Sequence, residues 1–229
     1  MILGGFQKLS LIDYPQKVSS VVFTQGCLFR CPFCHNPELI PLKSAGAVEV
    51  KEVLNYLESK KGMLEGLCIT GGEPTMQKDL PEFIAAVKKI GLAVKLDTNG
   101  TNPAMVEQLI KDNLVDYFAM DLKHTWSKYD LVANIGNQNA IDNCQKTFKL
   151  IQDSKIDHEF RTTVFPAVHR EDDFIEIVKN IKPGEKYFLQ QVEYIKNLDP
   201  QIDKTKILDL ESIIAKLKMT FPAVIINGR

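Results

Sequence analysis

Two hydrophobic patterns alternate along this chain: short β-branched runs, and segments with apolar residues at helical spacing. The short runs predict strands at residues 19–24, 67–70, 93–96, 117–120, 159–165 and 187–190, and a last short one at 224–226. The other segments predict helices at residues 50–60, 79–91, 103–113, 141–153, 172–180 and 208–218. Six strand–helix units in this order are typical of an α/β fold with a parallel sheet.

Chain length narrows the choice of α/β architecture. Right-handed crossovers roll a parallel sheet toward a barrel, but a complete eight-fold barrel usually takes about 250 residues. For 229 residues we therefore predict an incomplete (β/α)6 barrel with a parallel sheet, open on one side. We expect a single domain that consists of an N-terminal extension at 1–18, a barrel core at 19–195, and a C-terminal helix and short strand at 196–229.

Composition excludes several classes of function. The formal net charge is −1, which gives no basic footprint for nucleic acid or an acidic membrane. No apolar run approaches the roughly 20 residues that span a bilayer, and residues 1–5 lack the pattern of a signal peptide. We therefore expect a cytoplasmic protein without nucleic-acid or membrane partners. In that reducing compartment the five cysteines, an odd number, are expected to bind metal or do chemistry rather than form disulfides.

Three of the cysteines, Cys27, Cys31 and Cys34, lie in one eight-residue stretch just after the first predicted strand. Three thiolates are one fewer than the four that usually hold an iron–sulfur cluster, and an iron without a protein ligand keeps an open position. The alternative is a Cys3His zinc site that includes His35, although adjacent Cys34 and His35 would have difficulty reaching one tetrahedral ion. The remaining two cysteines stand alone and are expected to be buried apolar fillers, at Cys68 and Cys144.

Polar side chains lie at or near the carboxyl ends of successive predicted strands: Cys27, Glu73, Asp97, Asp121 and Arg161. That edge is the face where parallel α/β folds build their sites. Gly71 and Gly72 let the backbone approach a ligand closely, and the Glu73 carboxylate can accept hydrogen bonds from an ammonium group.

The two aspartates at this edge raise a question of charge. Asp97 and Asp121 would repel each other in a partly dry cleft. Lys123 supplies one countercharge, and a bound monovalent cation between the aspartates is a hypothesis for a second. Arg161 offers a planar fork that suits a carboxylate or a ribose edge; the alternative is a salt bridge at the barrel mouth.

Taken together, these motifs resemble the radical S-adenosylmethionine (radical SAM) superfamily. The cysteine loop has an aromatic residue before its last cysteine, Gly-Gly-Glu-Pro follows the second strand, and the Asp97, Asp121 and Arg161 segments resemble motifs of the glycyl-radical-activating branch. The resemblance implies a [4Fe–4S] cluster on the three clustered cysteines, with no catalytic side chain beyond the cluster and S-adenosylmethionine. It also implies cofactor contacts from Phe33, Gly71, Gly72, Glu73, Asp97, Thr98, Asn99, Asp121, Lys123 and Arg161.

Four longer segments are similar to the anaerobic ribonucleoside-triphosphate reductase activating proteins, at residues 5–15, 34–39, 95–100 and 159–163. This likeness implies reductive cleavage of S-adenosylmethionine to a 5′-deoxyadenosyl radical, which takes hydrogen from a glycine of the reductase. A reduced flavodoxin or ferredoxin is the implied electron donor. An activase of another glycyl radical enzyme, a radical SAM enzyme with a small-molecule substrate, and a non-enzymatic zinc or iron–sulfur protein remain alternatives. His35 could lie near the cluster or be a surface histidine, and Gln190 could face the adenosine or the substrate.

Overall fold

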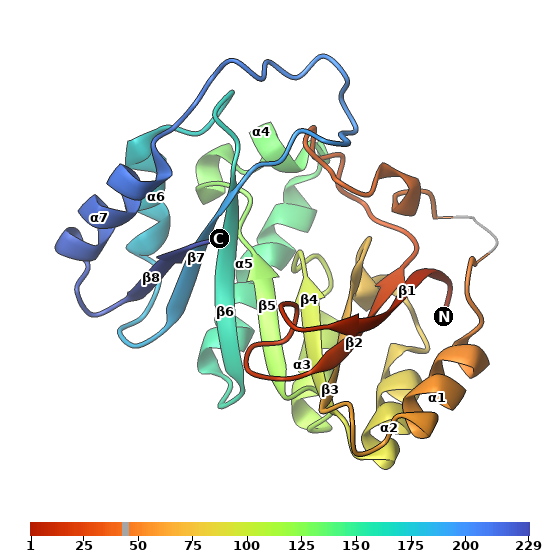
Figure 1. Cartoon of the computed structure of the whole chain (residues 1–229). Coiled ribbons are helices and arrows are strands. Elements are labelled where there is room, and N and C mark those ends of the chain that lie inside the picture. The colour runs from red at the N-terminus through yellow and green to blue at the C-terminus, as the bar shows by residue number, and fades with distance from the viewer. Residues whose placement is uncertain (43–45) are drawn as a thin grey trace.

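Eight strands form one sheet whose spatial order follows the chain from β1 to β8 (Figure 1). The structure is a computed structural model that describes residues 1–42 and 46–229. Strands β2 to β8 are parallel, whereas β1 runs antiparallel to β2. The bounds are Leu3–Ser10 (β1), Ser19–Thr24 (β2), Gly66–Gly71 (β3), Ala93–Thr98 (β4), Tyr117–Asp121 (β5), Asp157–Val164 (β6), Lys186–Gln191 (β7) and Ile225–Gly228 (β8).

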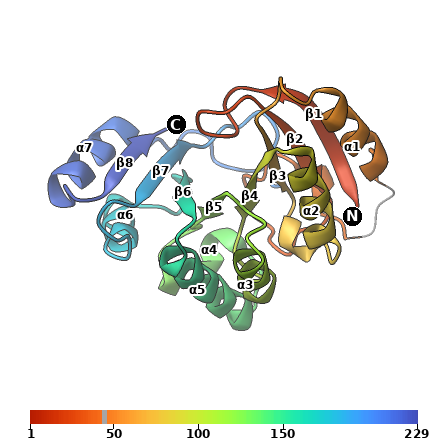
Figure 2. The same cartoon turned by 90° about the horizontal axis from the view of Figure 1, so that it is seen from below.

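The helices lie on the convex side of the curved sheet (Figure 2). The α-helices span Val50–Ser59 (α1), Leu80–Ile90 (α2), Pro103–Lys111 (α3), Asp130–Ala133 (α4), Gln138–Asp153 (α5), Glu171–Val178 (α6) and Leu210–Thr220 (α7). Short 3-10 helices span Pro37–Leu39 (η1), Pro74–Met76 (η2) and Trp126–Lys128 (η3). Within the described residues the end strands β1 and β8 do not pair with each other. The predicted incomplete barrel, open on one side, is therefore confirmed.

The sequence pattern missed the first strand. Residues 1–18 were expected to form an extension, but β1 adds an antiparallel edge to the sheet and pairs Phe6 with Val22. The Ser20 hydroxyl also donates a hydrogen bond of 2.7 Å to the Lys8 carbonyl. Gly4 and Gly5 together with three exposed positions along β1 hide the usual signature of a half-buried strand.

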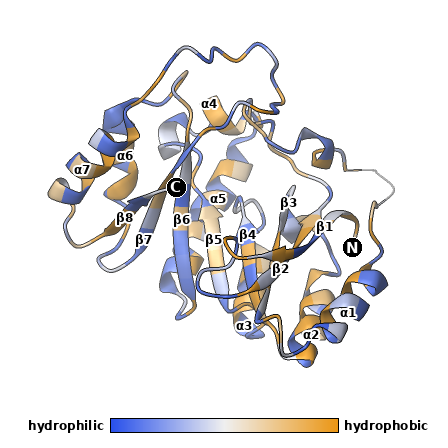
Figure 3. Cartoon of the chain, viewed as in Figure 1, coloured by the Kyte–Doolittle hydropathy of each residue, from blue (hydrophilic) through white to orange (hydrophobic). Residues whose placement is uncertain are grey.

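Apolar side chains of the helices and strands form the core. Leu96 on β4 and Phe118 on β5 are fully buried in the middle of the sheet, and Ile84 packs from α2. Figure 3 shows hydrophobic and hydrophilic residues together on the surrounding helices, as expected for helices with one face on a sheet. Gly91 ends α2 in the left-handed conformation, with φ of 99°, a position that glycine adopts without steric cost.

After β7 the chain arches over the carboxyl ends of the strands before it reaches α7 (Figure 1). This arch touches the cysteine loop: the Asp199 N–H donates to the Pro32 carbonyl at 3.0 Å, and Lys196 forms an ion pair with Glu38 at 2.7 Å. The loop and the arch thus lie together above the strand ends. No helix in the described part of the chain has the length and hydrophobicity needed to cross a membrane.

Candidate functional site

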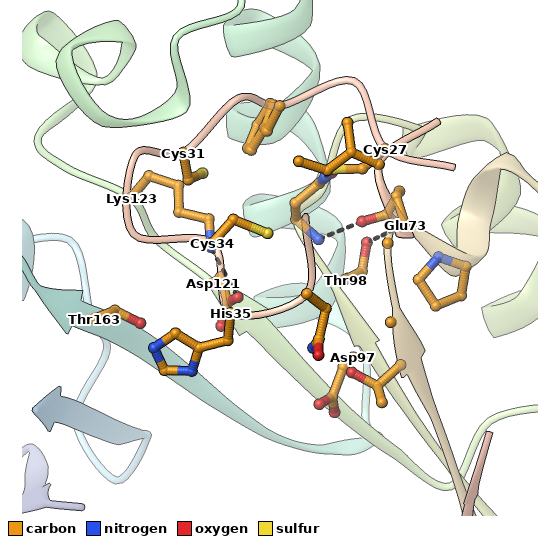
Figure 4. A pocket seen from close by; sticks show the side chains of 18 of the residues that line it. Cys27, Cys31, Cys34, His35, Glu73, Asp97, Thr98, Asp121, Lys123 and Thr163 are labelled. Atoms are coloured by element: carbon orange, nitrogen blue, oxygen red, sulfur yellow. Dashed lines mark hydrogen bonds and ion pairs between the residues drawn. The ribbon is translucent and has the colours of Figure 1, made fainter. Parts of the chain in front are cut away.

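One cavity at the carboxyl ends of the strands collects most of the predicted site residues. All ten predicted cofactor-contacting residues and the three clustered cysteines line it. Figure 4 shows the cysteine loop on one side of this cavity and the ends of β3, β4, β5 and β6 on the other. The additional lining residues are Phe29, His35, Asn36, Ile40, Thr70, Pro74 and Thr163.

The cysteine loop is held in place by backbone hydrogen bonds. The Cys27 N–H donates to Ile40 at 3.1 Å, and the Glu73 N–H donates to the Gly26 carbonyl at 2.7 Å, which ties the loop to the end of β3. Phe33, predicted to contact the cofactor, also packs on Phe165 with ring centroids 5.2 Å apart. Packing and hydrogen bonds therefore fix the loop from which the thiols project.

Cysteine sulfur is the ligand that iron–sulfur clusters take, and Cys27, Cys31 and Cys34 bring three such ligands to this cavity. Burial raises the pKa of Cys27 to about 12 and that of Cys31 to about 11, so these thiols keep their protons until a metal displaces them. In the described residues no three Cys, His, Asp or Glu side chains are close enough to hold one metal ion. Ligands of a cluster bind different iron atoms and therefore stand farther apart than the ligands of one ion. The donor set on this loop fits a cluster.

His35 does not support the zinc alternative. Its imidazole points away from the Cys34 sulfur and toward Thr163 in Figure 4, and its Nε2 lies 3.1 Å from the Glu193 carbonyl oxygen. The ring thus contacts the arch after β7 instead of completing a Cys3His set.

The Gly-Gly-Glu segment packs directly against the cysteine loop. Gly71 has a φ of +110°, which favours glycine, and a Cβ on Gly72 would overlap the Gly26 carbonyl oxygen. The fully buried Glu73 carboxylate accepts hydrogen bonds from the Thr75 N–H and hydroxyl, the Thr98 hydroxyl at 2.7 Å, and the Asn99 N–H at 2.6 Å. Burial raises the pKa of Glu73, and these donated hydrogen bonds oppose the rise. A contact from Glu73 to an ammonium group stays a prediction.

The charged side chains on β4, β5 and β6 form one continuous chain of ion pairs. Arg161 donates from Nη1 to Asp97 at 3.1 Å and from Nε to Asp121 at 2.9 Å. Lys123 pairs with Asp121 at 3.0 Å, and the buried Lys95 pairs with Asp97. Lys95 was not predicted as a site residue.

These cations control the ionisation of the two aspartates. Burial alone would raise the pKa of Asp97, but Arg161 and Lys95 outweigh it and hold the pKa below its ordinary value. Burial would likewise raise the pKa of Asp121, and Arg161 with Lys123 lowers it instead. Both carboxylates are therefore ionised in this arrangement.

Arg161 also bears on the proposed monovalent cation. Its guanidinium bridges Asp97 and Asp121 and so supplies the second countercharge that motivated the cation. The salt bridge that was the alternative for Arg161 is present. A cation at this place and an Arg161 contact to S-adenosylmethionine both stay predictions.

The two isolated cysteines are buried as predicted, but Cys68 is more than an apolar filler. Its thiol lies 3.8 Å from Asp97 and 3.7 Å from the Lys95 ammonium. Gln190 is not among the residues that line the cavity, whereas Thr163 on the preceding strand is. The alternation of side chains along a strand places Thr163 on the same face as Arg161, which is a signal available from sequence.

Fold and site together define a partial α/β barrel with a three-cysteine loop above the strand ends. A family model described as the radical SAM superfamily matches residues 21–181. A protein of Methanocaldococcus jannaschii, named provisionally as a glycyl-radical enzyme activating enzyme, is 38% identical over 195 residues, which cover 84% of this chain and 80% of the relative. This chain therefore belongs to the radical SAM superfamily and, within it, to the glycyl-radical enzyme activating enzymes.

One further relative and one solved structure are also similar to this chain. The pyruvate formate-lyase-activating enzyme of Clostridium pasteurianum is 26% identical over 202 residues, 81% of each chain. The solved structure of Streptococcus suis SuiB bound to S-adenosylmethionine matches with a TM-score of 0.73 at 16% identity, over 91% of this chain and 49% of SuiB. This chain thus spans about half the length of SuiB, and that likeness concerns the fold. The cofactors of this superfamily are a [4Fe–4S] cluster and S-adenosylmethionine.

Proposed function

We propose that this enzyme installs the glycyl radical of an anaerobic ribonucleoside-triphosphate reductase. The observation that carries the proposal is that three cysteine thiols and the ion pairs around Arg161 lie in one cavity at the strand ends. The similarity of residues 5–15 and 34–39 to activating proteins of that reductase supports the choice of partner. We further propose that the enzyme works in the cytoplasm.

Each group in the cavity has a role in the proposal. Cys27, Cys31 and Cys34 would hold the cluster, and Asn99 lies ready to donate to the Cys27 sulfur, with its Nδ2 at 3.7 Å. When bound, the cluster supplies the electron that cleaves S-adenosylmethionine, whose adenosyl fragment takes a hydrogen atom from a partner glycine. The flavodoxin or ferredoxin class would supply that electron.

The charge balance of the cavity suits the methionine end of S-adenosylmethionine. Arg161, Lys95 and Lys123 exceed the carboxylates Asp97 and Asp121 by one positive charge, and the Glu73 carboxylate also lines the cavity. This arrangement suits an α-carboxylate bound beside the cations and an ammonium group bound beside Glu73. No side chain needs to move a proton in this scheme, so Asp97 and Asp121 would orient the substrate instead of acting as acid or base.

The open side of the barrel supports a macromolecular substrate, because a glycine on a protein loop must reach the cavity from outside. A second candidate partner is pyruvate formate-lyase, which is favoured by the name of the Clostridium pasteurianum relative. A small-molecule substrate is a third reading of the same cofactor site.

Electron paramagnetic resonance distinguishes these candidates. The reconstituted protein is reduced, mixed with S-adenosylmethionine, and incubated with either glycyl radical enzyme. The proposal expects a protein glycyl doublet with the ribonucleotide reductase and none with pyruvate formate-lyase. The Cys34→Ala variant is the negative control and should give no doublet. A doublet only with pyruvate formate-lyase would replace the proposed partner. Multiple turnovers on a metabolite without a doublet would exclude an activase.

A further inference from the structure

Glu159 is a third carboxylate beside the Arg161 guanidinium. Both residues lie on β6, two positions apart, so their side chains project from the same face of the sheet. The Glu159 side chain is completely buried, and its Oε2 accepts a hydrogen bond from the Tyr117 hydroxyl at 3.0 Å. A buried carboxylate needs a cation or strong donors to stay ionised.

Arg161 lies close enough to Glu159 to serve as its cation. Its Nη1 is 4.0 Å from Glu159 Oε1, compared with 3.1 Å from Asp97 Oδ2. The same nitrogen could therefore turn from Asp97 to Glu159 with a small movement. If it did, the bridge between Asp97 and Asp121 would open.

Arg229 prevents Glu159 from competing with Asp97 for Arg161. Its two terminal nitrogens bind the two Glu159 oxygens at 2.7 and 2.8 Å, the bidentate geometry in which a guanidinium fork matches a carboxylate. Its guanidinium carbon stands 3.8 Å from the centroid of the Phe188 ring, so the side chain crosses β7 to reach β6.

The backbone of Arg229 is also fixed. Its N–H donates to the Leu189 carbonyl at 2.9 Å, and its carbonyl accepts from the Gln191 N–H at 2.9 Å. Both bonds continue the pairing of β8 with β7 beyond Gly228. The end of β8 thus holds the guanidinium in place, and an arginine there loses little additional freedom on pairing.

We propose that Arg229 is a positioning residue that satisfies Glu159 and so reserves Arg161 for Asp97 and Asp121. Arg229 does not line the cavity around the three cysteines, and it would act on S-adenosylmethionine only through Arg161. This inference rests on the proposed function in one respect, namely that Asp97, Asp121 and Arg161 contact S-adenosylmethionine.

The test uses the full chain, reconstituted anaerobically, with S-adenosylmethionine titrated against Arg229→Gln, Glu159→Gln and the double variant. Arg229→Gln should weaken binding at least about tenfold, the size found when the hydrogen-bonded partner behind a ligating residue is lost. Glu159→Gln should bind like the unaltered protein because no carboxylate then competes for Arg161. The double variant should regain the lost affinity. Lys216→Gln, which breaks an exposed ion pair with Glu171, is the matched control.

A second readout needs no cofactor. Urea unfolding of the apoprotein should show that Arg229→Gln destabilises strongly when Glu159 is present and weakly when it is glutamine. Equal affinity for S-adenosylmethionine in Arg229→Gln and the unaltered protein would overturn the inference, as would a double variant no better than Arg229→Gln. If S-adenosylmethionine binds as expected but no glycyl radical forms, the proposed function fails while this inference stands.

Discussion

Arg161 is the position where the chain of ion pairs can be tested most sharply. It is the only side chain in the described structure that pairs with both Asp97 and Asp121. Arg161→Gln removes two charge-assisted hydrogen bonds of 2.9 and 3.1 Å from carboxylates that lie mostly out of water. Removing one partner of a buried pair costs about 3–5 kcal/mol. Each aspartate keeps one lysine, so we expect the lower end, a loss of about 3 kcal/mol in the free energy of unfolding.

Urea unfolding of the apoprotein measures this loss. Trp126 is the only tryptophan of the chain and stacks on Tyr129 with ring centroids 5.1 Å apart, so its fluorescence reports on the packed state. The control is Lys182→Gln, which breaks an exposed pair with Asp153 and should cost less than about 1 kcal/mol.

A further substitution separates charge from packing. If the loss comes from unpaired carboxylates, adding Asp121→Asn to Arg161→Gln should recover at least about 1 kcal/mol, within the range of coupling between contacting residues. An Arg161→Gln variant as stable as the Lys182→Gln control would refute the reasoning. So would a double variant that is less stable than Arg161→Gln alone.

Two other predictions concern stability and cluster retention. Burial, with help from His124, lowers the pKa of His169 to about 4, so between pH 6.5 and 4 the unfolded chain binds the proton and the folded chain does not. The free energy of unfolding should therefore fall by up to about 3 kcal/mol as the pH drops through that window. Urea midpoints measured against pH should fall less steeply in His169→Asn than in the unaltered protein. An equal fall in both would contradict the assignment of this pH dependence to His169. Gly72→Ala should retain less iron after reconstitution and lose more than about 1 kcal/mol of stability, because the added Cβ overlaps the Gly26 carbonyl oxygen. The control is Gly5→Ala, whose Cβ would have its nearest neighbour at 3.4 Å. Equal iron content in the two variants would contradict the packing argument.

The arrangement of strands follows from the hydrophobic periodicity of the sequence, and much of the site follows from which polar residues stand at the strand ends. Buried runs that alternate with amphipathic segments define the parallel part of the sheet, and the carboxyl ends of its strands place Asp97, Asp121 and Arg161 on one edge. The structure confirms that these three residues meet. A rule about strand ends was sufficient because it does not depend on the details of side-chain packing.

Strand alternation could also have identified Lys95 and Glu159. Each stands two residues before a predicted site residue, Asp97 and Arg161, and so must share its face of the sheet. A charged residue on an inward face needs a partner there, which makes both positions part of the same network. This signal is present in the sequence.

Other features depend on contacts that no local pattern encodes. Strand β1 forms because its backbone pairs with β2, despite two adjacent glycines. Arg229 reaches Glu159 only because β8 lies beside β7, a proximity set by the whole sheet. Whether Arg161 or a bound cation neutralises Asp97 and Asp121 likewise depends on the length and direction of the arginine side chain, which composition and spacing do not determine.

The central claim is that the three-cysteine loop holds a cluster with one iron free to bind S-adenosylmethionine. Electron paramagnetic resonance of the reduced, reconstituted protein, recorded with and without S-adenosylmethionine, tests it most directly. We expect a cluster signal that changes when S-adenosylmethionine is added, that is absent in Cys34→Ala, and that persists in Cys144→Ala, which alters a buried thiol outside the cavity. A signal that does not respond to S-adenosylmethionine, or one that survives in Cys34→Ala, would contradict the account.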